Sequence, residues 1–339
     1  TMGIDGKVAA WIKAFLSDRT QRVCVDGQLS GSSDVLSGVP QGTILGPLLF
    51  LCFINDLPSV VDPDPQIRLF ADDCLAYRVI DSIEQQHVFQ QDLDNLTNWG
   101  HQWGMHFNPG KCNVIRLTHS SKPLTIFYKM NGKILQDVEL AQYLGITIHK
   151  SLEFACHIRE TVAKANKRLG FLKRNRERTP TAVKKMAYSS LVRSGLEYGS
   201  VIWDPHTSSQ TKAVEAVQNS AIRWMMGFGP RQRCSISKLR SELELQTLEE
   251  RRSLQRLTLM YKMVSGKVVV TPEDLGLQSA DSRTRASHGH KFREKRARTN
   301  RLKFSPVFRT IAEWNKLPAL VAEADSVNIF KSQLNAHRP

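Results

Sequence analysis

The pattern of apolar and polar residues near the start of the chain predicts a short helix followed by short strands. Residues 8–16 carry apolar side chains three and four positions apart, which predicts a short helix. Residues 21–29 alternate around Asp26-Gly27, a dipeptide that favours the two-residue turn of a β-hairpin. A further strand is expected over residues 33–36, so this region should fold as a helix followed by paired strands.

A loop with two glycines and a proline, residues 37–42, opens into an apolar stretch over residues 45–57. Because this stretch is apolar on most sides of a helix, it is predicted to be a buried helix. Two apolar runs flank a pair of aspartates within residues 67–80 and predict a hairpin, and residues 83–103 repeat at helical spacing. Further strand candidates are residues 113–117, 124–129, 134–138 and 143–148.

The pattern changes near Leu152, where strand signals stop and helical periodicity takes over. We therefore divide the chain into an α+β part, residues 1–151, and an all-helical domain, residues 152–266. Residues 267–303 are polar and basic and are expected to form a flexible connection. Apolar residues return over residues 304–339, which we expect to be a C-terminal helical segment.

Two adjacent carboxylates, Asp72 and Asp73, lie between apolar runs. Neighbouring side chains of a regular strand point to opposite faces, so a tight turn between residues 67–71 and 74–80 is expected to lift the pair out of the sheet. Exposed carboxylates side by side repel each other unless a cation joins them, and Mg²⁺ is the hard ion that prefers oxygen ligands. On the pair alone, a solvated acidic turn is the alternative.

The composition narrows the choice of partner and compartment. The hydrophobic content of 41% is enough for a packed core. The formal charge of +15 favours a polyanionic partner, and a nucleic acid is a better candidate than a membrane surface. None of the six cysteines forms a C-x-x-C pair, so neither a zinc site nor a disulfide scaffold is indicated. No apolar run is long enough to span a membrane, and no secretory signal is present. We expect an intracellular protein, nuclear or cytoplasmic.

Basic residues are concentrated in residues 158–178, which contain eight lysines and arginines but only two glutamates. Because the apolar stripe of this helix faces one way, the cations line another face, which suits the sugar–phosphate backbone of a nucleic acid. An ordinary solvated helix face is the alternative. A second basic cluster, residues 291–303, is compatible with RNA binding, a nuclear address or a solvated linker.

Four segments, read in order, resemble the motifs of reverse transcriptases from non-LTR (LINE-type) retrotransposons. The matching segments are residues 37–50 for the B motif, 70–73 for the C motif, Trp99, Trp103 and residues 107–112 for the D region, and 143–145 for the E motif. Any one of these motifs is a weak signal, whereas four in this order are specific. Toward the C-terminus, Arg251-Arg252, Tyr261-Lys262 and residues 314–318 resemble the corresponding region of jockey-like elements.

The resemblance implies a role for each matching residue. Asp72 matches a metal ligand, Asp73 its neighbour beside the primer end, and Lys111 the lysine that neutralises or protonates the leaving pyrophosphate. The loop along the templating base and the incoming nucleotide is matched by Gly38, Pro40, Gln41 and Gly42. The primer grip is matched by Tyr143, Leu144 and Gly145. Contacts to the nucleic-acid backbone are implied for Lys164, Lys167, Arg168, Lys173 and Arg174.

The fold that the resemblance implies is part of a right-hand polymerase. Residues 1–151 would be a partial palm with a small antiparallel sheet, followed by an all-α thumb and a C-terminal helical extension. The implied reaction is Mg²⁺-dependent transfer of nucleotides from dNTPs to a DNA primer on an RNA template, with two metal ions held by carboxylates.

One part of the family pattern is missing from the 339 residues. The A motif, whose aspartate is the first metal ligand, lies upstream of the B motif in the family, and Asp5, in a glycine-flanked turn, does not match it. We therefore expect this chain alone to be inactive as a polymerase, since losing such a group costs orders of magnitude in rate. The alternative is a non-catalytic, nucleic-acid-binding remnant of a retroelement.

Overall fold

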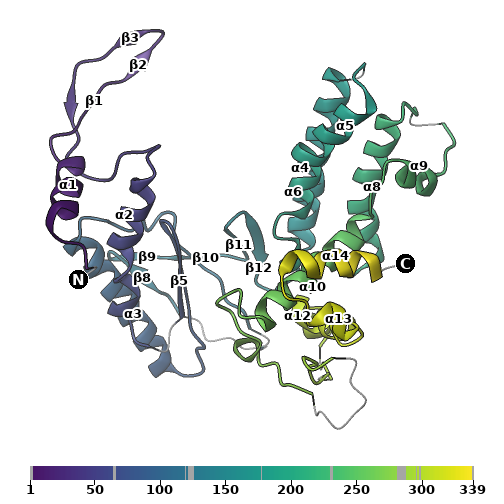
Figure 1. The fold of residues 1–339 in the computed structure, drawn as a ribbon. Coiled ribbons are helices and arrows are strands. Elements are labelled where there is room, and N and C mark those ends of the chain that lie inside the picture. Colours follow the sequence, from purple (N-terminus) through teal and green to yellow (C-terminus); the bar gives the residue numbers. More distant parts are fainter. Residues whose placement is uncertain are drawn as a thin grey trace. The chain divides into compact units, whose positions relative to one another are not determined.

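The computed structural model describes the chain in two compact units, Thr1–Val138 and Glu139–Pro339 (Figure 1). The described residues are 3–63, 66–118, 120, 126–176, 178–229, 232–280, 288–294, 296, 297 and 299–337. Of the strand predicted over residues 124–129, residues 124 and 125 lie outside this set, as do Lys295 and Arg298 of the second basic cluster. Within the described part of the chain, no helix is long and apolar enough to cross a membrane.

The first unit begins with the predicted helix and hairpin, and both are confirmed. The elements are α1 (Gly6–Leu16), β1 (Thr20–Gln21), β2 (Cys24–Val25), β3 (Gln28–Leu29) and β4 (Ser33–Asp34). Asp26 and Gly27 have φ values of +48° and +82°, as the predicted two-residue turn between β2 and β3 requires. β4 pairs with β1, and Figure 1 shows the paired strands as an extended arm of this unit.

The apolar helix forms, but the prediction that it is buried is wrong. α2 spans Leu45–Ile54, three residues shorter than predicted, and a 3₁₀ turn, η1 (Leu57–Val60), follows it. Only Gly46 and Ile54 of α2 are buried, whereas Leu48 and Leu51 are each 53% exposed. A helix that is apolar on all sides needs cover on all sides, and the described residues pack against one side only.

The core of the first unit lies between α3 and short strands. α3 (Ile83–Gln102) is capped at its N-terminus by Ser82, whose side chain accepts a hydrogen bond from the Gln85 N–H at 3.3 Å. The helix buries Leu93, Leu96 and Trp99. The strands are β5 (Gln66–Phe70), β6 (Asp73–Tyr77), β7 (Asn113–Val114), β8 (Lys129–Met130), β9 (Lys133–Ile134) and β10 (Gln136–Asp137).

The small antiparallel sheet expected within residues 1–151 is confirmed only in part by the described residues. They form six two-stranded sheets instead, and β10 pairs with β7 in parallel. Most of these strands are two residues long, too short to carry a ladder across to a third strand.

The second unit opens with a hairpin and continues almost entirely as helices. The hairpin strands β11 (Leu140–Tyr143) and β12 (Ile146–His149) pack with the helices that follow. The helical elements are α4 (Ala155–Asn175), α5 (Thr181–Tyr188), the π-helical turn η2 (Ser189–Arg193), α6 (Ser194–Glu197), α7 (Ser200–Trp203), α8 (Ser208–Met225), α9 (Ile236–Glu242) and α10 (Leu248–Val264). They enclose one core, in which Tyr188, Val192 and Val214 are fully buried.

A second core in this unit joins the end of α10 to the C-terminal helices. Its C-terminal side chains come from α12 (Pro306–Trp314), α13 (Ala319–Ala322) and α14 (Val327–His337), and the chain between α10 and α12 also forms η3 (Glu273–Leu275) and α11 (Asn300–Lys303). Phe292 lies in this core at 6% exposure, and His288 is also buried, edge-on to Trp314. This part of residues 267–303 is therefore packed, which differs from the flexible connection predicted there.

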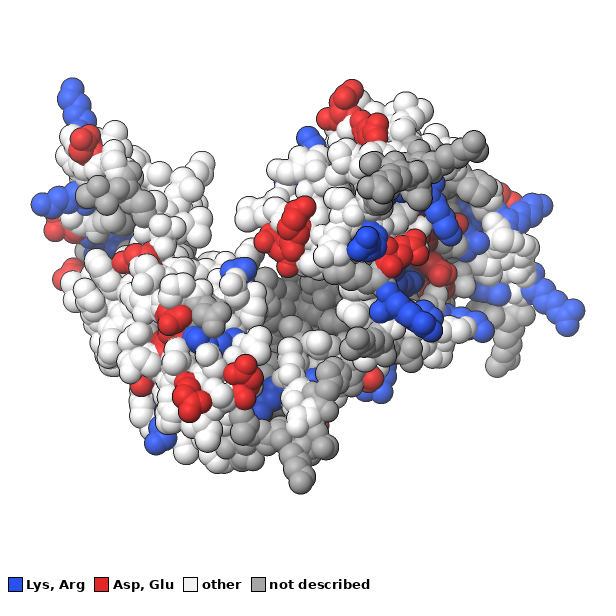
Figure 2. All heavy atoms as spheres, turned by 90° about the horizontal axis from the view of Figure 1, so that it is seen from below, with Lys and Arg blue, Asp and Glu red and all other residues white. Residues whose placement is uncertain are grey.

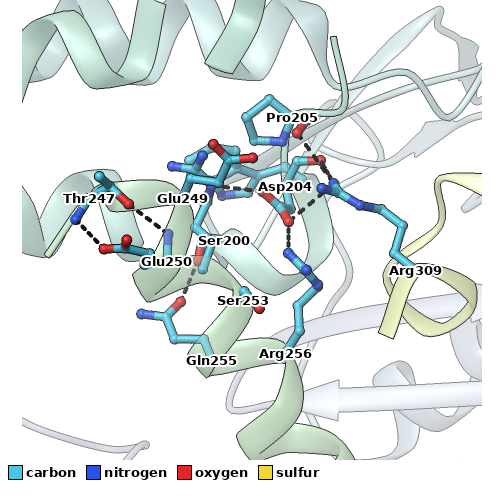
Figure 3. A network of polar contacts seen from close by, with 12 residues as sticks. Ser200, Asp204, Pro205, Thr247, Glu249, Glu250, Ser253, Gln255, Arg256 and Arg309 are labelled. Carbon is cyan, nitrogen blue, oxygen red and sulfur yellow. Dashed lines mark hydrogen bonds and ion pairs between the residues drawn. The ribbon is translucent and has the colours of Figure 1, made fainter. Parts of the chain in front are cut away.

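A buried ionic network connects these helices. Asp204, just after α7, accepts hydrogen bonds from Arg252 Nε at 2.7 Å and from Arg256, both in α10. Arg309 of α12 lies 3.1 Å from the same carboxylate (Figure 3). Arg256 also contacts Glu313. Figure 3 shows Arg256 and Arg309 converging on Asp204, so one aspartate links three helical segments.

Candidate functional site

The two adjacent aspartates lie at the tip of the β5–β6 hairpin. Phe70 pairs with Asp73, so Ala71 and Asp72 form the two-residue turn, and Ala71 takes the left-handed conformation at φ +51°. The predicted tight turn is thus confirmed, although Asp73 already belongs to the second strand. Both carboxylates are exposed, and among the described residues neither has a hydrogen-bond or ion-pair partner.

The strand register explains why the tip is presented to solvent. Residues directly opposite in an antiparallel pair share one face. Leu69 and Cys74 form one such pair and pack on the core with Ile67, whereas Phe70 and Asp73 form the next pair and face outward. Burial, with a smaller contribution from the nearby Cys112, raises the pKa of the Cys74 thiol to about 11. The hairpin is therefore anchored by its inner face while its outer face and tip stay open.

The turn that carries Lys111 packs against the same core as Cys74. Cys112, the next residue, lies in that core with its Sγ 3.2 Å from the carbonyl oxygen of Asn108. The Asn108 side chain accepts the Gly110 N–H at 3.0 Å, which fixes the turn, and Lys111 is exposed. The first unit thus gathers Lys111 and the aspartate hairpin around one core, but no ion pair between them is present in the described residues.

The loop over residues 37–42 is held by contacts that local sequence patterns do not reveal. Arg19 donates to the Gly38 carbonyl at 2.8 Å, and the Thr43 hydroxyl donates to the Pro40 carbonyl at 2.8 Å. Gly38 and Gly42 have φ values of +74° and +77°, which only glycine adopts easily. Gln41 and both glycines are exposed, so the backbone of this loop is open to a ligand.

A further close approach occurs at Gly46, at the start of α2. A Cβ atom there would lie 2.7 Å from the Pro40 carbonyl oxygen, so a side chain would displace the loop from the helix. Arg19 and Gly46 thus position the loop. Gly46 lies in the B-like segment, whereas nothing in the sequence marks Arg19.

The turn over Tyr143, Leu144 and Gly145 belongs to the second unit. It is the two-residue turn between β11 and β12, with Leu144 at φ +45° and Gly145 at φ +77°. The Tyr198 hydroxyl donates to the Leu144 carbonyl at 2.8 Å. Tyr198 is distant in sequence and carries no motif, so sequence reasoning missed it.

The basic face of α4 is largely open, with one exception. Lys164, Lys167, Arg168 and Arg174 are exposed. Lys173 is half-buried with its ammonium group 2.8 Å from the Ser220 hydroxyl, and burial lowers its pKa. The structure thus leaves four of the five proposed phosphate contacts available to solvent. On the face drawn in Figure 2, basic and acidic side chains are interspersed, so the excess positive charge forms no single patch there.

Two carboxylates alone do not make a complete metal site. Mg²⁺ prefers octahedral oxygen coordination, and Asp72 with Asp73 offers suitable donors. Across the described ranges, however, no group of three or more His, Cys, Asp or Glu residues is arranged to hold a metal ion.

Comparison with known proteins identifies relatives of this chain. Residues 1–148 match the family model described as reverse transcriptase (RNA-dependent DNA polymerase). The chain is 27% identical to the RNA-directed DNA polymerase from mobile element jockey of Drosophila melanogaster, over 64% of this chain and 25% of the relative. It is 32% identical to the probable RNA-directed DNA polymerase from transposon BS of the same species, over 62% of this chain and 25% of the relative. For that from transposon X-element, also of Drosophila melanogaster, identity is 26% over 64% of this chain and 24% of the relative. The chain spans about a quarter of the length of these relatives.

Proposed function

We propose that this chain, which carries a reverse transcriptase domain over residues 1–148 and is homologous to RNA-directed DNA polymerases of non-LTR retrotransposons, holds the primed template in such a polymerase. The observation that carries the proposal is the tight turn that presents Asp72 and Asp73 to solvent inside the matched segment. In the whole polymerase the reaction is nucleotidyl transfer from a dNTP to a DNA 3′ end on an RNA template.

The residues divide between two tasks in this proposal. Residues 1–151 act as part of a palm, in which the loop with Gly38, Pro40, Gln41 and Gly42 follows the templating base and Lys111 faces the leaving pyrophosphate. Residues 152–266 act as a thumb, whose exposed cations on α4 contact phosphates. The Tyr143–Gly145 turn grips the primer strand. The open backbone of the loop and the exposure of Lys164, Lys167 and Arg168 support these roles.

The metal requirement limits what the 339 residues do alone. Reverse transcriptases generally use divalent metal ions. Asp72 and Asp73 supply two carboxylates, and the described residues supply no third ligand beside them. This donor set does not fit a complete site, so we derive no chemical step through it. We expect the 339-residue chain to bind a primed template without extending the primer.

One pair of assays tests both halves of the proposal. A DNA primer with a fluorescent label, annealed to an RNA template, is titrated with the purified chain at low salt while anisotropy is followed. We expect saturable binding that weakens as salt is added, because phosphate contacts release counterions. The same complex is then given dNTPs with Mg²⁺ or Mn²⁺, and we expect no extension.

The binding assay tests the template-holding role, and the extension assay tests the expectation that the chain alone is inactive. Absence of binding at low salt would refute the template-holding role. Extension that disappears in Asp72→Asn would refute the view that the chain is inert alone and would establish Asp72 in the reaction. Replacing Lys164 and Lys167 by Gln should weaken binding more than replacing Lys129 and Lys133, two exposed lysines of the β8–β9 hairpin. Equal weakening would place the phosphate contacts elsewhere than on α4.

A further inference from the structure

The turn between β11 and β12 is held in a conformation that its sequence does not favour. Leu144 has φ +45°, in the left-handed region that a branched L side chain rarely adopts. Such a residue persists only where surrounding contacts fix it, and these positions cluster at functional sites. A specific contact therefore has to hold the Leu144 backbone.

That contact comes from Tyr198, at the end of α6. Its hydroxyl donates a hydrogen bond of 2.8 Å to the Leu144 carbonyl oxygen. Its ring lies over the next residue, since a Cβ atom on Gly145 would lie 3.4 Å from Tyr198 Cε1. Tyr198 is 59% exposed, so burial does not account for its position.

The backbone of Tyr198 is itself fixed by hydrogen bonds. Its backbone N–H donates to the Ser194 carbonyl at 3.0 Å, and its own carbonyl accepts the Trp203 indole N–H at 2.9 Å. Gly199 follows with φ +59°, and a Cβ atom there would lie 2.6 Å from Ile146 Cδ1, so the backbone lies directly against β12. The backbone of Tyr198 is thus held in place on both sides of its Cα atom.

The support closes into a ring of contacts within the second unit. Trp203 is 1% exposed and lies edge-on to His157, with ring centroids 5.5 Å apart. His157 Nδ1 accepts the N–H of Thr147, a residue of β12, at 3.2 Å. This hydrogen bond connects the helices back to the hairpin. The β11–β12 turn is consequently tied to the helices at its tip and along one strand.

We infer that Tyr198 is a positioning residue for the primer strand: its hydroxyl fixes the Leu144–Gly145 turn against α6. This inference rests on the proposed function, in which the Tyr143–Gly145 turn grips the primer. Tyr198 contacts the turn and not the reacting atoms, so removing its hydroxyl alters where the primer lies more than whether the nucleic acid binds.

The test compares Tyr198→Phe with Tyr188→Phe in the full chain. Tyr188 is fully buried, and its hydroxyl donates to Gln218 at 2.9 Å, so each variant loses one hydroxyl hydrogen bond in the same unit. The probe is a DNA primer that carries a photoactivatable thymidine at its 3′ end, annealed to an RNA template. Cross-links are mapped by mass spectrometry, and binding is measured by anisotropy.

We expect the wild-type chain to cross-link at residues 143–145. Tyr198→Phe should lower this yield about threefold to tenfold, the factor that loss of one hydrogen bond produces, with a smaller change in dissociation constant. Tyr188→Phe should leave the cross-link yield unchanged when measured well below its unfolding temperature. Faster hydrogen exchange of the peptide over residues 140–149 in Tyr198→Phe alone would support the loss of the turn contact.

The outcomes separate the two proposals. A wild-type chain that does not bind the primed template refutes the proposed function. Binding with a cross-link at the turn that is identical in Tyr198→Phe refutes the positioning role while leaving the proposed function intact. Binding with no cross-link at residues 143–145 refutes both the primer grip and the role of Tyr198.

Discussion

Removal of the Asp204 carboxylate should destabilise the second unit more than loss of an exposed acidic side chain. The side chain is 4% exposed and meets Arg252, Arg256 and Arg309. The acidic side chain that shares Arg256 is Glu313, which is 40% exposed. In Asp204→Ala, the guanidinium groups of Arg252 and Arg256 remain buried without this counter-charge.

The free-energy cost of Asp204→Ala can be estimated from the absence of other acceptors for the buried arginines. Breaking a buried ion pair by removing one partner costs about 3–5 kcal/mol, because an uncompensated charge stays in the interior. Arg252 Nη1 and Nη2 and Arg256 Nε already have no hydrogen-bond partner among the described residues, so no spare acceptor is ready to replace Asp204. We therefore expect about 4 kcal/mol. With an m-value of about 2 kcal/mol per molar urea, the unfolding midpoint should fall by about 2 M.

Urea unfolding followed by tryptophan fluorescence measures this change, since Trp203 and Trp314 are buried in the two cores of the unit. Glu139→Ala is the control, because it removes a carboxylate from an exposed pair with Lys150 and should shift the midpoint little. If Asp204→Ala unfolds at the wild-type urea concentration, or shifts no more than the control, the network does not hold these helices together and the reasoning is refuted.

Three further predictions concern the hairpin and the basic helix. Burial lowers the pKa of His157 below its usual value near 6.5, so the native state favours the neutral ring; stability should be full above about pH 6.5 and fall as the pH drops below it. Urea midpoints at several pH values check this, and His157→Gln should flatten the dependence. Gly145→Ala should cost about 1 kcal/mol, because φ is +77°, a conformation that strains any residue with a Cβ atom, and a thermal melt without a shift would contradict it. Replacing Lys164 and Lys167 by Gln should reduce the slope of log K against log salt by about 2 on a primed template, and an unchanged slope would exclude them as phosphate contacts.

The hairpins could be predicted because their determinants are local. Asp26-Gly27 supplies two residues that tolerate positive φ, and the structure uses both of them. At the aspartate hairpin the sequence indicates the turn but not its register. Leu69 and Cys74 pair inward on the core, and that choice moves the left-handed position to Ala71. Register was decided by which side chains the core takes up, which the turn residues alone do not reveal.

The misses involve partners that are distant in the sequence. Arg19 meets the Gly38 carbonyl, and Tyr198 meets that of Leu144, 54 residues away. No periodicity reports such contacts, because each is a single side chain on a surface of irregular backbone. The burial of α2 was predicted from its apolar composition. Composition shows that a helix would gain from burial on all sides, but not whether other residues pack against those sides.

The β11–β12 hairpin shows how motif and packing divide a chain differently. The family match ends at residue 148, and the sequence pattern placed a boundary near Leu152, yet the compact units divide between Val138 and Glu139. Packing accounts for the difference, since the Thr147 hydroxyl donates to Glu160 of α4 at 2.9 Å and its N–H to His157. The turn proposed to grip the primer and the basic face proposed to contact phosphates are therefore parts of one packed unit. Their spacing is fixed by the contacts of α4 with β12, so a variant that loosens those contacts should weaken both functions together.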